Sequence, residues 1–214
     1  MQISVITVTR NSSRTIARTV NSVSSQHEVN VEHIIKDACS IDRTIEFAQC
    51  ANSSVVVISK PDIGIYDAMN QGFLASTGEV VAFLNSDDYY IDRHVLSDVV
   101  KMFNETDCDF VYGNITMTSP TGEIVREWHS DLLDDAGLVG RQIPHPAIFI
   151  KREVLNHLTL PFDSSYRIAA DLKQQLVIIN HLKFKGKHLN RSLVIMETGG
   201  TSTHSFSSYF MGWT

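Results

Sequence analysis

Residues 3–9 read Ile3-Ser4-Val5-Ile6-Thr7-Val8-Thr9, a run rich in β-branched residues that is typical of a buried strand. A helical stretch follows to about Ser25, with candidate N-cap residues at positions 11–13. The alternation continues with β-rich runs at residues 31–36, 55–59 and 80–84, the last two continuously apolar as in buried strands, and with helical stretches at residues 44–50 and 65–74. Strands that alternate with helices predict βαβ units and a mostly parallel sheet.

The second half of the chain has a less regular pattern. It predicts a helix over 92–104, a strand over 110–112, a hairpin at 119–122, a loop or lid over 130–141, a strand over 144–150, a helix over 171–182 and a strand over 191–197. Residues 199–214 are small, polar and poorly periodic. We therefore expect one α/β domain of Rossmann-like type, with a mostly parallel central sheet flanked by helices and a mixed second half.

Composition excludes several classes of protein. The chain has 214 residues, 43% of them hydrophobic, which is enough to bury one core. Its net charge is −6 and its 18 Lys and Arg residues are scattered, so nothing resembles the basic face of a nucleic-acid binder. The sequence predicts no signal peptide and no run of roughly 18 apolar residues that would span a membrane. The three cysteines form no CxxC pair, which suits a reducing cytoplasm and argues against zinc.

Polar residues follow three of the predicted parallel strands. Asp37 follows the second strand, Asp62 comes shortly after the third, and Asn85-Ser86-Asp87-Asp88 follows the fourth. Ligands of open parallel sheets bind outside the carboxyl ends of the strands, so these side chains are candidates for a binding site. For Asp37 and Asp62, the alternative is that they cap turns and helices.

The adjacent carboxylates of Asp87 and Asp88 predict a divalent metal ion. Two carboxylates at the end of a buried strand repel one another unless a positive charge lies near them. Mg²⁺ and Mn²⁺ prefer carboxylate oxygen and are commonly bound through one or two carboxylates together with substrate phosphates. The chain contains no Walker motif, GxGxxG or HExxH, so other nucleotide-binding and metalloprotease interpretations lose support.

Four ordered segments carry a family resemblance, which extends over roughly residues 1 to 205. Residues 3–9, 37–44, 62–72 and 84–88 resemble, in order and spacing, the motifs of family 2 glycosyltransferases of the GT-A type. Within that family the chain is most similar to bacterial enzymes that build O-antigen and other surface polysaccharides. It departs from the family pattern at Asn85, at Ala38 where Gly is usual, and at Lys60 where Glu is frequent.

The resemblance implies roles on the donor side of a transfer reaction. It implies that Asp37 binds the base of a nucleotide, usually uracil, and that Asn85-Ser86-Asp87 occupies the position of the DxD motif. Asp87 would then ligate Mn²⁺ or Mg²⁺ at the diphosphate of a nucleotide-diphosphate sugar, with Asp88 orienting the metal or the sugar. Asp62 and Asn85 are further candidates for binding the donor.

On the acceptor side, the resemblance implies that Asp171 deprotonates the acceptor hydroxyl. Asp163 is the competing carboxylate, although its place beside Phe162 also suits a turn, and Asp171 could instead be an acid favoured by a helix dipole. His145 matches a histidine near the acceptor or the donor phosphate, and a satisfied structural histidine is the equal alternative. His204 and Trp128 are weaker candidates, for the diphosphate and for stacking on a sugar.

The expected function is that of an inverting, metal-dependent glycosyltransferase. Residues 1–115 would bind a nucleotide sugar, with a UDP-sugar as the expected donor, and residues 116–214 a lipid-linked or oligosaccharide acceptor. A lipid-linked acceptor would bring a cytoplasmic enzyme to the inner face of the membrane. The alternatives are a non-catalytic sugar-nucleotide-binding module and a sugar nucleotidyltransferase, whose glycine-rich loop after the first strand is missing from residues 9–13.

Overall fold

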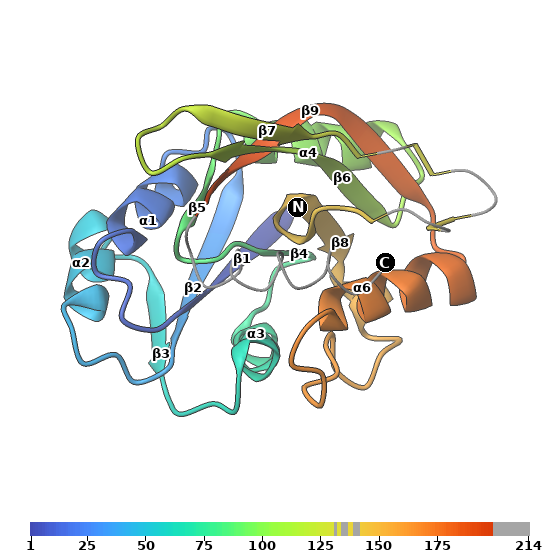
Figure 1. The fold of residues 1–214 in the computed structure, drawn as a ribbon. Helices are drawn as coiled ribbons and strands as arrows, with labels where there is room; N and C mark the ends of the chain where they lie inside the picture. Colours follow the sequence, from blue (N-terminus) through green and yellow to red (C-terminus); the bar gives the residue numbers. More distant parts are fainter. Residues whose placement is uncertain (131, 134–136, 139–141, 199–214) are drawn as a thin grey trace, which may run out of the picture.

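The computed structural model describes residues 1–130, 132–133, 137–138 and 142–198. These residues form a nine-stranded sheet in the order β3-β2-β1-β4-β8-β6-β9-β5, with β7 paired to β6 (Figure 1). The strands are β1 (Gln2–Thr9), β2 (Asn30–Asp37), β3 (Val56–Ser59), β4 (Val80–Phe83), β5 (Asp88–Tyr90), β6 (Phe110–Thr118), β7 (Ile124–Trp128), β8 (Ile148–Lys151) and β9 (Gly186–Glu197). The main helices are α1 (Ile16–Ser24), α2 (Thr44–Ala51), α3 (Ile65–Ala75), α4 (Val95–Glu105), α5 (Arg152–Leu155) and α6 (Ala170–Gln175).

The first four strands form the predicted parallel sheet. β1 lies between β2 and β4 and is parallel to both, and β2 is parallel to β3. All four strands therefore end at one edge, where Thr9 of β1 pairs with Asp37 of β2. The α/β fold class and the parallel first half are confirmed.

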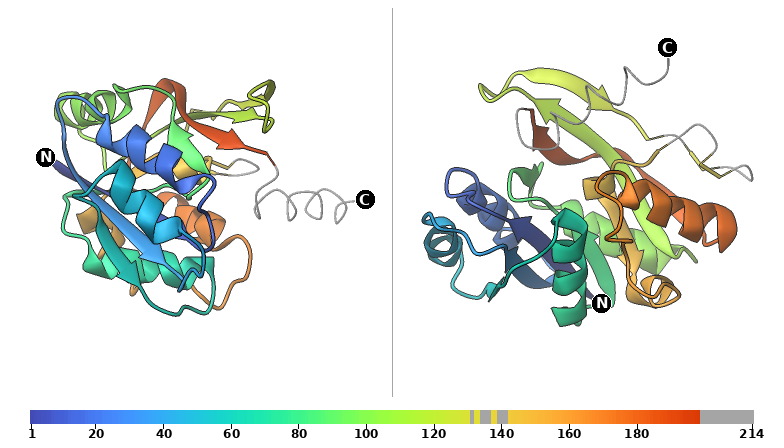
Figure 2. Two further views of the ribbon diagram at one scale, coloured as in Figure 1. Left: turned by 90° about the vertical axis from the view of Figure 1, so that its left-hand side faces the viewer. Right: turned by 60° about the horizontal axis from the view of Figure 1, so that its bottom comes forward.

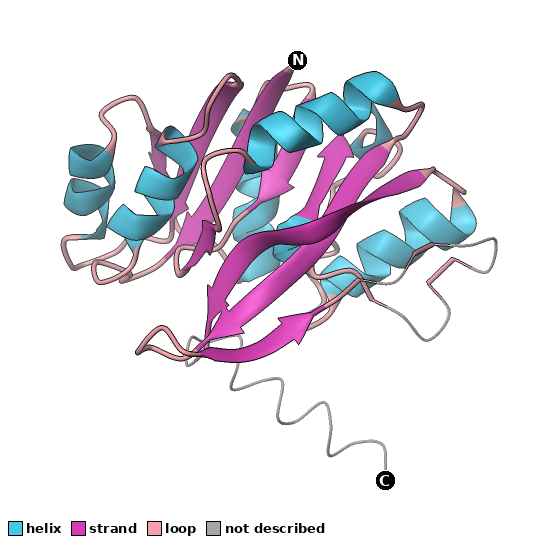
Figure 3. Ribbon diagram, turned by 90° about the horizontal axis from the view of Figure 1, so that it is seen from above, coloured by secondary structure: helices cyan, strands magenta, loops and turns pink. Residues whose placement is uncertain are grey.

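The rest of the sheet is mixed, as expected. β8 is antiparallel to both β4 and β6, β9 is parallel to β6, and β5 is antiparallel to β9. The predicted hairpin joins β6 to β7 through a turn in which Gly122 has a φ of 85°. Figure 3 shows the long strands β6 and β9 continuing the sheet beyond its parallel part.

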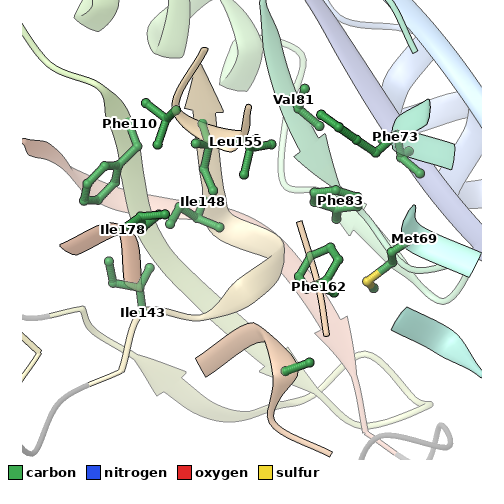
Figure 4. Close-up of a cluster of buried hydrophobic side chains, with 14 of the residues drawn as sticks. Met69, Phe73, Val81, Phe83, Phe110, Ile143, Ile148, Leu155, Phe162 and Ile178 are labelled. Atoms are coloured by element: carbon green, nitrogen blue, oxygen red, sulfur yellow. The ribbon is translucent and has the colours of Figure 1, made fainter. Parts of the chain in front are cut away.

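Three hydrophobic cores pack on the sheet and give it its layers. The first contains side chains of α3, α5 and α6, the second contains side chains of α4 and the end of α1, and the third contains side chains of α1, α2 and β2. In the right-hand view of Figure 2, α3 and α6 come forward on the same side of the sheet. Phe83 of β4 and Phe162 meet edge to face in the first core, with Met69 of α3 beside them (Figure 4). Helices on both faces bury the apolar sides of the sheet.

Several sequence-based expectations in the first half need correction. The run 55–59 was expected to be a buried strand, but β3 is an edge strand in which Val56 is 48% exposed. The side chains of residues 11–13 do not cap α1, which begins after Thr15 without a side-chain cap. Gly78, three residues beyond α3, permits close approach to β1, because a Cβ there would lie 2.5 Å from the Ser4 hydroxyl.

The second half differs from expectation in the boundaries of its elements. Residues 144–150 do not form one strand: a 3-10 turn, η1 (His145–Ala147), precedes β8. Proline at 144 and 146 explains this, since neither residue has an N–H for a strand ladder. The expected helix over 171–182 is α6 followed by a π-helical turn, η2 (Leu176–His181).

The remaining expectations concern residues 130–141, residues 199–214 and membrane-spanning segments. Most of the predicted loop at 130–141 and all of the segment 199–214 lie outside them. Across the described residues, none of the helices combines the length and hydropathy that crossing a lipid bilayer requires.

Candidate functional site

Hydrogen bonds from α1 hold the acidic turn that follows β4, residues 85–88. The Thr19 hydroxyl lies 3.0 Å from the carbonyl oxygen of Ser86 and 2.8 Å from that of Asp88. Arg18 Nη2 donates to the carbonyl oxygen of Asp87 at 3.2 Å, and the Ser86 hydroxyl donates to Ser12 at 2.9 Å. Side chains from α1 and from the β1–α1 loop thus fix the backbone that presents the two carboxylates.

The carboxylates themselves lie in a low-dielectric environment. Asp88 is 1% exposed, and burial raises its pKa well above the ordinary value, an effect that the neighbouring Asp87 reinforces. The Asn85 amide donates to Asp88 Oδ2 at 3.2 Å and opposes this rise in pKa. Burial also raises the pKa of Asp87, with a smaller contribution from Glu197. Without a cation, negative charge at this turn is therefore unfavourable.

Unpartnered oxygens at the same turn fit a divalent cation. Asp88 Oδ1 and Asn85 Oδ1 are buried, and neither has a hydrogen-bond partner among the described residues. Both are hard oxygen ligands of the kind that Mg²⁺ and Mn²⁺ take. No group of three or more His, Cys, Asp and Glu side chains that could hold a metal occurs within the described part of the chain. A cation at this turn would thus need oxygens of a bound ligand as well as Asp87 and Asp88.

Asp37 lies at the end of β2, fully buried, within a network of donors. Its Oδ2 accepts from the backbone N–H of Ser40 at 2.9 Å and from the Ser59 hydroxyl at 2.7 Å. Its Oδ1 accepts from the Ser40 hydroxyl. A carboxylate oxygen can accept more than one hydrogen bond, so Oδ1 retains the capacity for a further donor.

A buried lysine that the sequence analysis did not single out joins Asp37 to Asp62. Lys36 is fully buried, and its Nζ lies 2.8 Å from Asp62 Oδ2. The same ammonium donates to the carbonyl oxygens of Asp37 at 3.1 Å and Lys60 at 2.8 Å. Asp62 Oδ1 accepts from the N–H of Gly64 at 3.3 Å, so both of its oxygens are engaged in ordering the β3–α3 loop. The sequence signal for this ion pair was the placement of opposite charges, Lys36 and Asp62, at the ends of neighbouring strands.

Arg18 is a second residue that sequence reasoning missed. Its guanidinium forms a 2.7 Å ion pair with Glu197 at the end of β9 and lies 4.4 Å from the centroid of the Tyr89 ring. It also contacts Asp87, so α1, β5 and β9 meet at the acidic turn. An isolated arginine in a helical stretch gives no sequence signal for such a role.

Asp171 lies in the first turn of α6 and receives a hydrogen bond from α3, in the first half of the chain. The Tyr66 hydroxyl of α3 donates to Asp171 Oδ1 at 2.9 Å. Ala169, the residue before α6, has a left-handed backbone with a φ of 67°, which is strained for a side chain with a Cβ. Strained backbone of this kind is found at binding and catalytic sites more often than elsewhere.

His145 lies beside the same group of residues. Its ring stacks on Phe83 at 5.6 Å between centroids and meets Phe162 edge to face at 5.4 Å. Both ring nitrogens are buried without a hydrogen-bond partner among the described residues. Burial lowers the pKa of His145, whereas the charge of Asp171 opposes that shift, so the imidazole is neutral near pH 7. An imidazole whose two nitrogens are buried and have no partner among the described residues is suited to binding a polar ligand.

The other sequence candidates are placed away from this arrangement or outside it. Asp163 forms a 2.5 Å ion pair with Lys173 and accepts from the Ser165 N–H at 3.0 Å, contacts that lower its pKa to about 2. The turn expected at Asp163 is therefore present. Trp128 ends β7, 5.4 Å from the Arg126 guanidinium, and His204 lies outside the described residues.

Comparison with known proteins gives the family. The sequence model of Glycosyl transferase family 2 matches residues 4–158. A PGL/p-HBAD biosynthesis glycosyltransferase of Mycobacterium bovis is 30% identical over 173 residues, which are 78% of this chain and 66% of the relative. The chain therefore spans about two thirds of the length of that curated relative.

Two solved structures resemble the fold closely. TarS 1–349 of S. aureus in complex with UDP has a TM-score of 0.73 and 19% identity, over 92% of this chain and 61% of that one. The mannosyltransferase PcManGT from Pyrobaculum calidifontis, in complex with GDP-Man and Mn²⁺, has a TM-score of 0.71 and 16% identity, over 95% and 59%. The fold is thus that of GT-A glycosyltransferases. The chain belongs to glycosyl transferase family 2.

Proposed function

We propose that this chain is an inverting, metal-dependent glycosyltransferase that moves a sugar from a nucleotide-diphosphate donor to an acceptor hydroxyl. The observation that carries the proposal is the acidic turn after β4. In this family 2 chain, Asp88 is buried and Asp87 is half-buried, α1 fixes the turn, and Asp88 Oδ1 has no hydrogen-bond partner among the described residues. A non-catalytic binding module would not require a further carboxylate such as Asp171 on the acceptor side, where Tyr66 holds it by a hydrogen bond.

The donor would bind across the edge where the parallel strands end. We propose that Asp37 accepts a hydrogen bond from the nucleotide base, for which its Oδ1 retains capacity. UDP in the TarS structure supports a uridine donor, whereas GDP-Man in the mannosyltransferase makes guanosine the alternative. Asp62, whose oxygens are bonded to Lys36 and Gly64, would act on the donor by shaping the β3–α3 loop.

Asp87 and Asp88 would hold the Mn²⁺ or Mg²⁺ ion, with Asn85 beside them. A divalent ion bound there would neutralise the negative charge of the diphosphate leaving group. The chain's own contribution is to hold both carboxylates in a buried turn, where their mutual repulsion favours cation binding. Mn²⁺ in the mannosyltransferase structure supports this choice of metal.

On the acceptor side, Asp171 would be the general base and His145 a ligand of the donor phosphate or the acceptor. As the acceptor oxygen bonds to the anomeric carbon, the bond from that carbon to the diphosphate breaks and the acceptor proton passes to Asp171. One carboxylate on the face opposite the leaving group is what an inverting transfer requires. Residues 1–115 would thus serve the donor and residues 116–214 the acceptor, within one domain.

The acceptor that we propose is a lipid-linked or free oligosaccharide of surface polysaccharide synthesis, such as O-antigen. The mycobacterial relative, a PGL/p-HBAD biosynthesis glycosyltransferase, supports a role in surface glycans. An acceptor on a lipid carrier would bring the enzyme to the inner face of the cell membrane.

A screen of nucleotide sugars tests class, donor and metal together. We expect one donor to be hydrolysed in the presence of Mn²⁺, with release of its nucleoside diphosphate, and no release in EDTA. A non-catalytic module would bind a nucleotide sugar without releasing the diphosphate. A nucleotidyltransferase would instead release pyrophosphate from a nucleoside triphosphate and a sugar phosphate. Either of those results would overturn the proposal.

A further inference from the structure

One face of α3 contacts the acceptor half at two points, one helical turn apart. Tyr66 donates a hydrogen bond to Asp171. Asn70 donates to the carbonyl oxygen of Phe162 at 2.8 Å and accepts from the N–H of Phe162 at 3.0 Å. Residues four apart lie on the same side of a helix. On another side of α3, a Cβ at Gly72 would lie 2.4 Å from Ile6 of β1, so the helix is seated tightly on the donor sheet. A rigid helix of the donor half therefore reaches the segment that carries Asp171.

The Tyr66 hydroxyl is a dependable hydrogen-bond donor in this position. Burial, and then the charge and hydrogen bond of Asp171, raise the pKa of Tyr66, so the phenol keeps its proton across the working pH range. Its ring also packs against Phe162, with 5.6 Å between the centroids. The ring contact sets the position of the phenol, and the phenol in turn engages one oxygen of the Asp171 carboxylate.

We infer that Tyr66 is a positioning residue for the acceptor-side carboxylate: it holds Oδ1 of Asp171 and thereby makes Oδ2 the oxygen that receives the acceptor proton. The inference rests on the proposed function, because it presumes that Asp171 is the base. A carboxylate with one oxygen held has a defined lone-pair direction at the other. Such orientation contributes to the rate through geometry and leaves donor binding unaffected.

Tyr66→Phe removes the hydroxyl and keeps the ring that packs on Phe162. The change leaves Oδ1 of Asp171 without its charge-assisted hydrogen bond. The ¹³C resonance of the Asp171 carboxyl, assigned by its loss in Asp171→Asn, should therefore change its chemical shift at a fixed neutral pH. This measurement needs neither donor nor metal. Tyr166→Phe, in an exposed residue near Lys173, is the matched control and should leave that chemical shift unchanged.

Kinetics test the consequence for transfer, using the nucleotide sugar that the donor screen selects. We expect Tyr66→Phe to lower kcat about tenfold with donor KM unchanged, the size expected for one hydrogen bond to a charged group. A loss of kcat with donor KM unchanged is a split that a purely structural role would not produce. Tyr166→Phe should retain the kcat and the donor KM of the parent.

The possible results separate this inference from the function on which it rests. An unchanged carboxyl chemical shift, or a kcat within twofold of the parent, in Tyr66→Phe would overturn the positioning role and leave Asp171 as the base, provided that Asp171→Asn is inactive. Near-parent transfer by Asp171→Asn would remove the base itself, and the role of Tyr66 would fall with it.

Discussion

The proposed donor and acceptor sides of the candidate site are built in different ways. On the proposed donor side, regular parallel strands end at one edge, and α1 fixes the acidic turn through Arg18 and Thr19. On the proposed acceptor side, the six-residue helix α6 begins after the strained Ala169, and the ring nitrogens of His145 are buried without a partner among the described residues. Regular structure thus forms the proposed donor side, whereas the proposed acceptor side depends on a few long-range contacts. If the proposal holds, a fold built in this way can keep its donor chemistry while its acceptor side changes.

Asp87→Ala should have the largest effect and removes the central element of the donor side. We expect metal-dependent UDP binding to disappear and transfer to fall by about a thousandfold or more, because several kcal/mol of charge stabilisation is lost. Calorimetry with UDP and Mn²⁺ measures the first, and the kinetic assay the second. Asp107→Ala, in a fully exposed aspartate, is the control. UDP that binds Asp87→Ala as tightly as it binds the parent, or equally well in EDTA, would show that the metal site lies elsewhere.

Lys36→Met tests whether the donor side depends on its buried ion pair. The change leaves the Asp62 carboxylate and two carbonyl groups without their ammonium partner, so we expect the free energy of unfolding to fall by about 3 kcal/mol or more. Urea denaturation measures the loss. Lys185→Met removes an exposed lysine paired with Asp107 and should change the stability little. A loss below about 1 kcal/mol for Lys36→Met would mean that the donor side is not stabilised in this way.

Asp171→Asn tests the acceptor side and should leave the donor side intact. The amide keeps the shape of the side chain and can still accept from Tyr66, but it cannot take up a proton near neutral pH. We expect kcat to fall by at least about 100-fold, the contribution of a general base, with UDP affinity unchanged. Asp163→Asn should be close to the parent. If Asp163→Asn lowered kcat and Asp171→Asn did not, the base would be Asp163, and the acceptor side would be formed by other residues than those proposed.

The sequence predicts the donor half of the fold well because that half follows simple periodic rules. The apolar runs at 3–9 and 80–84 and the helical spacing of 65–74 each give an element within a residue or two of its observed bounds. Where the pattern misleads, a local packing constraint is the reason. Gly113 interrupts the apolar run that begins at Phe110, so β6 was predicted to be short. In the structure, a Cβ at Gly113 would lie 2.5 Å from Leu193, and the strand continues to Thr118 past a shift of register with β9.

The candidate site is predictable only as far as single residues reveal their chemistry. The paired carboxylates of Asp87 and Asp88 suggest a metal by themselves, because their repulsion requires compensation. The burial of Lys36 and the contact between Tyr66 and Asp171 depend on which side of an element faces which neighbour. The second contact joins residues 105 positions apart, and no local pattern encodes such a pairing.

The end strands of the sheet have a consequence for how the protein behaves at high concentration. β3 is four residues long and is followed directly by Lys60 and Pro61, and β5, at the other end, has only three residues. An open edge invites pairing with another chain when it is long, flat and free of charge and proline. These two ends offer little length on which a foreign strand could pair. Strand addition at β3 and at β5 is therefore disfavoured.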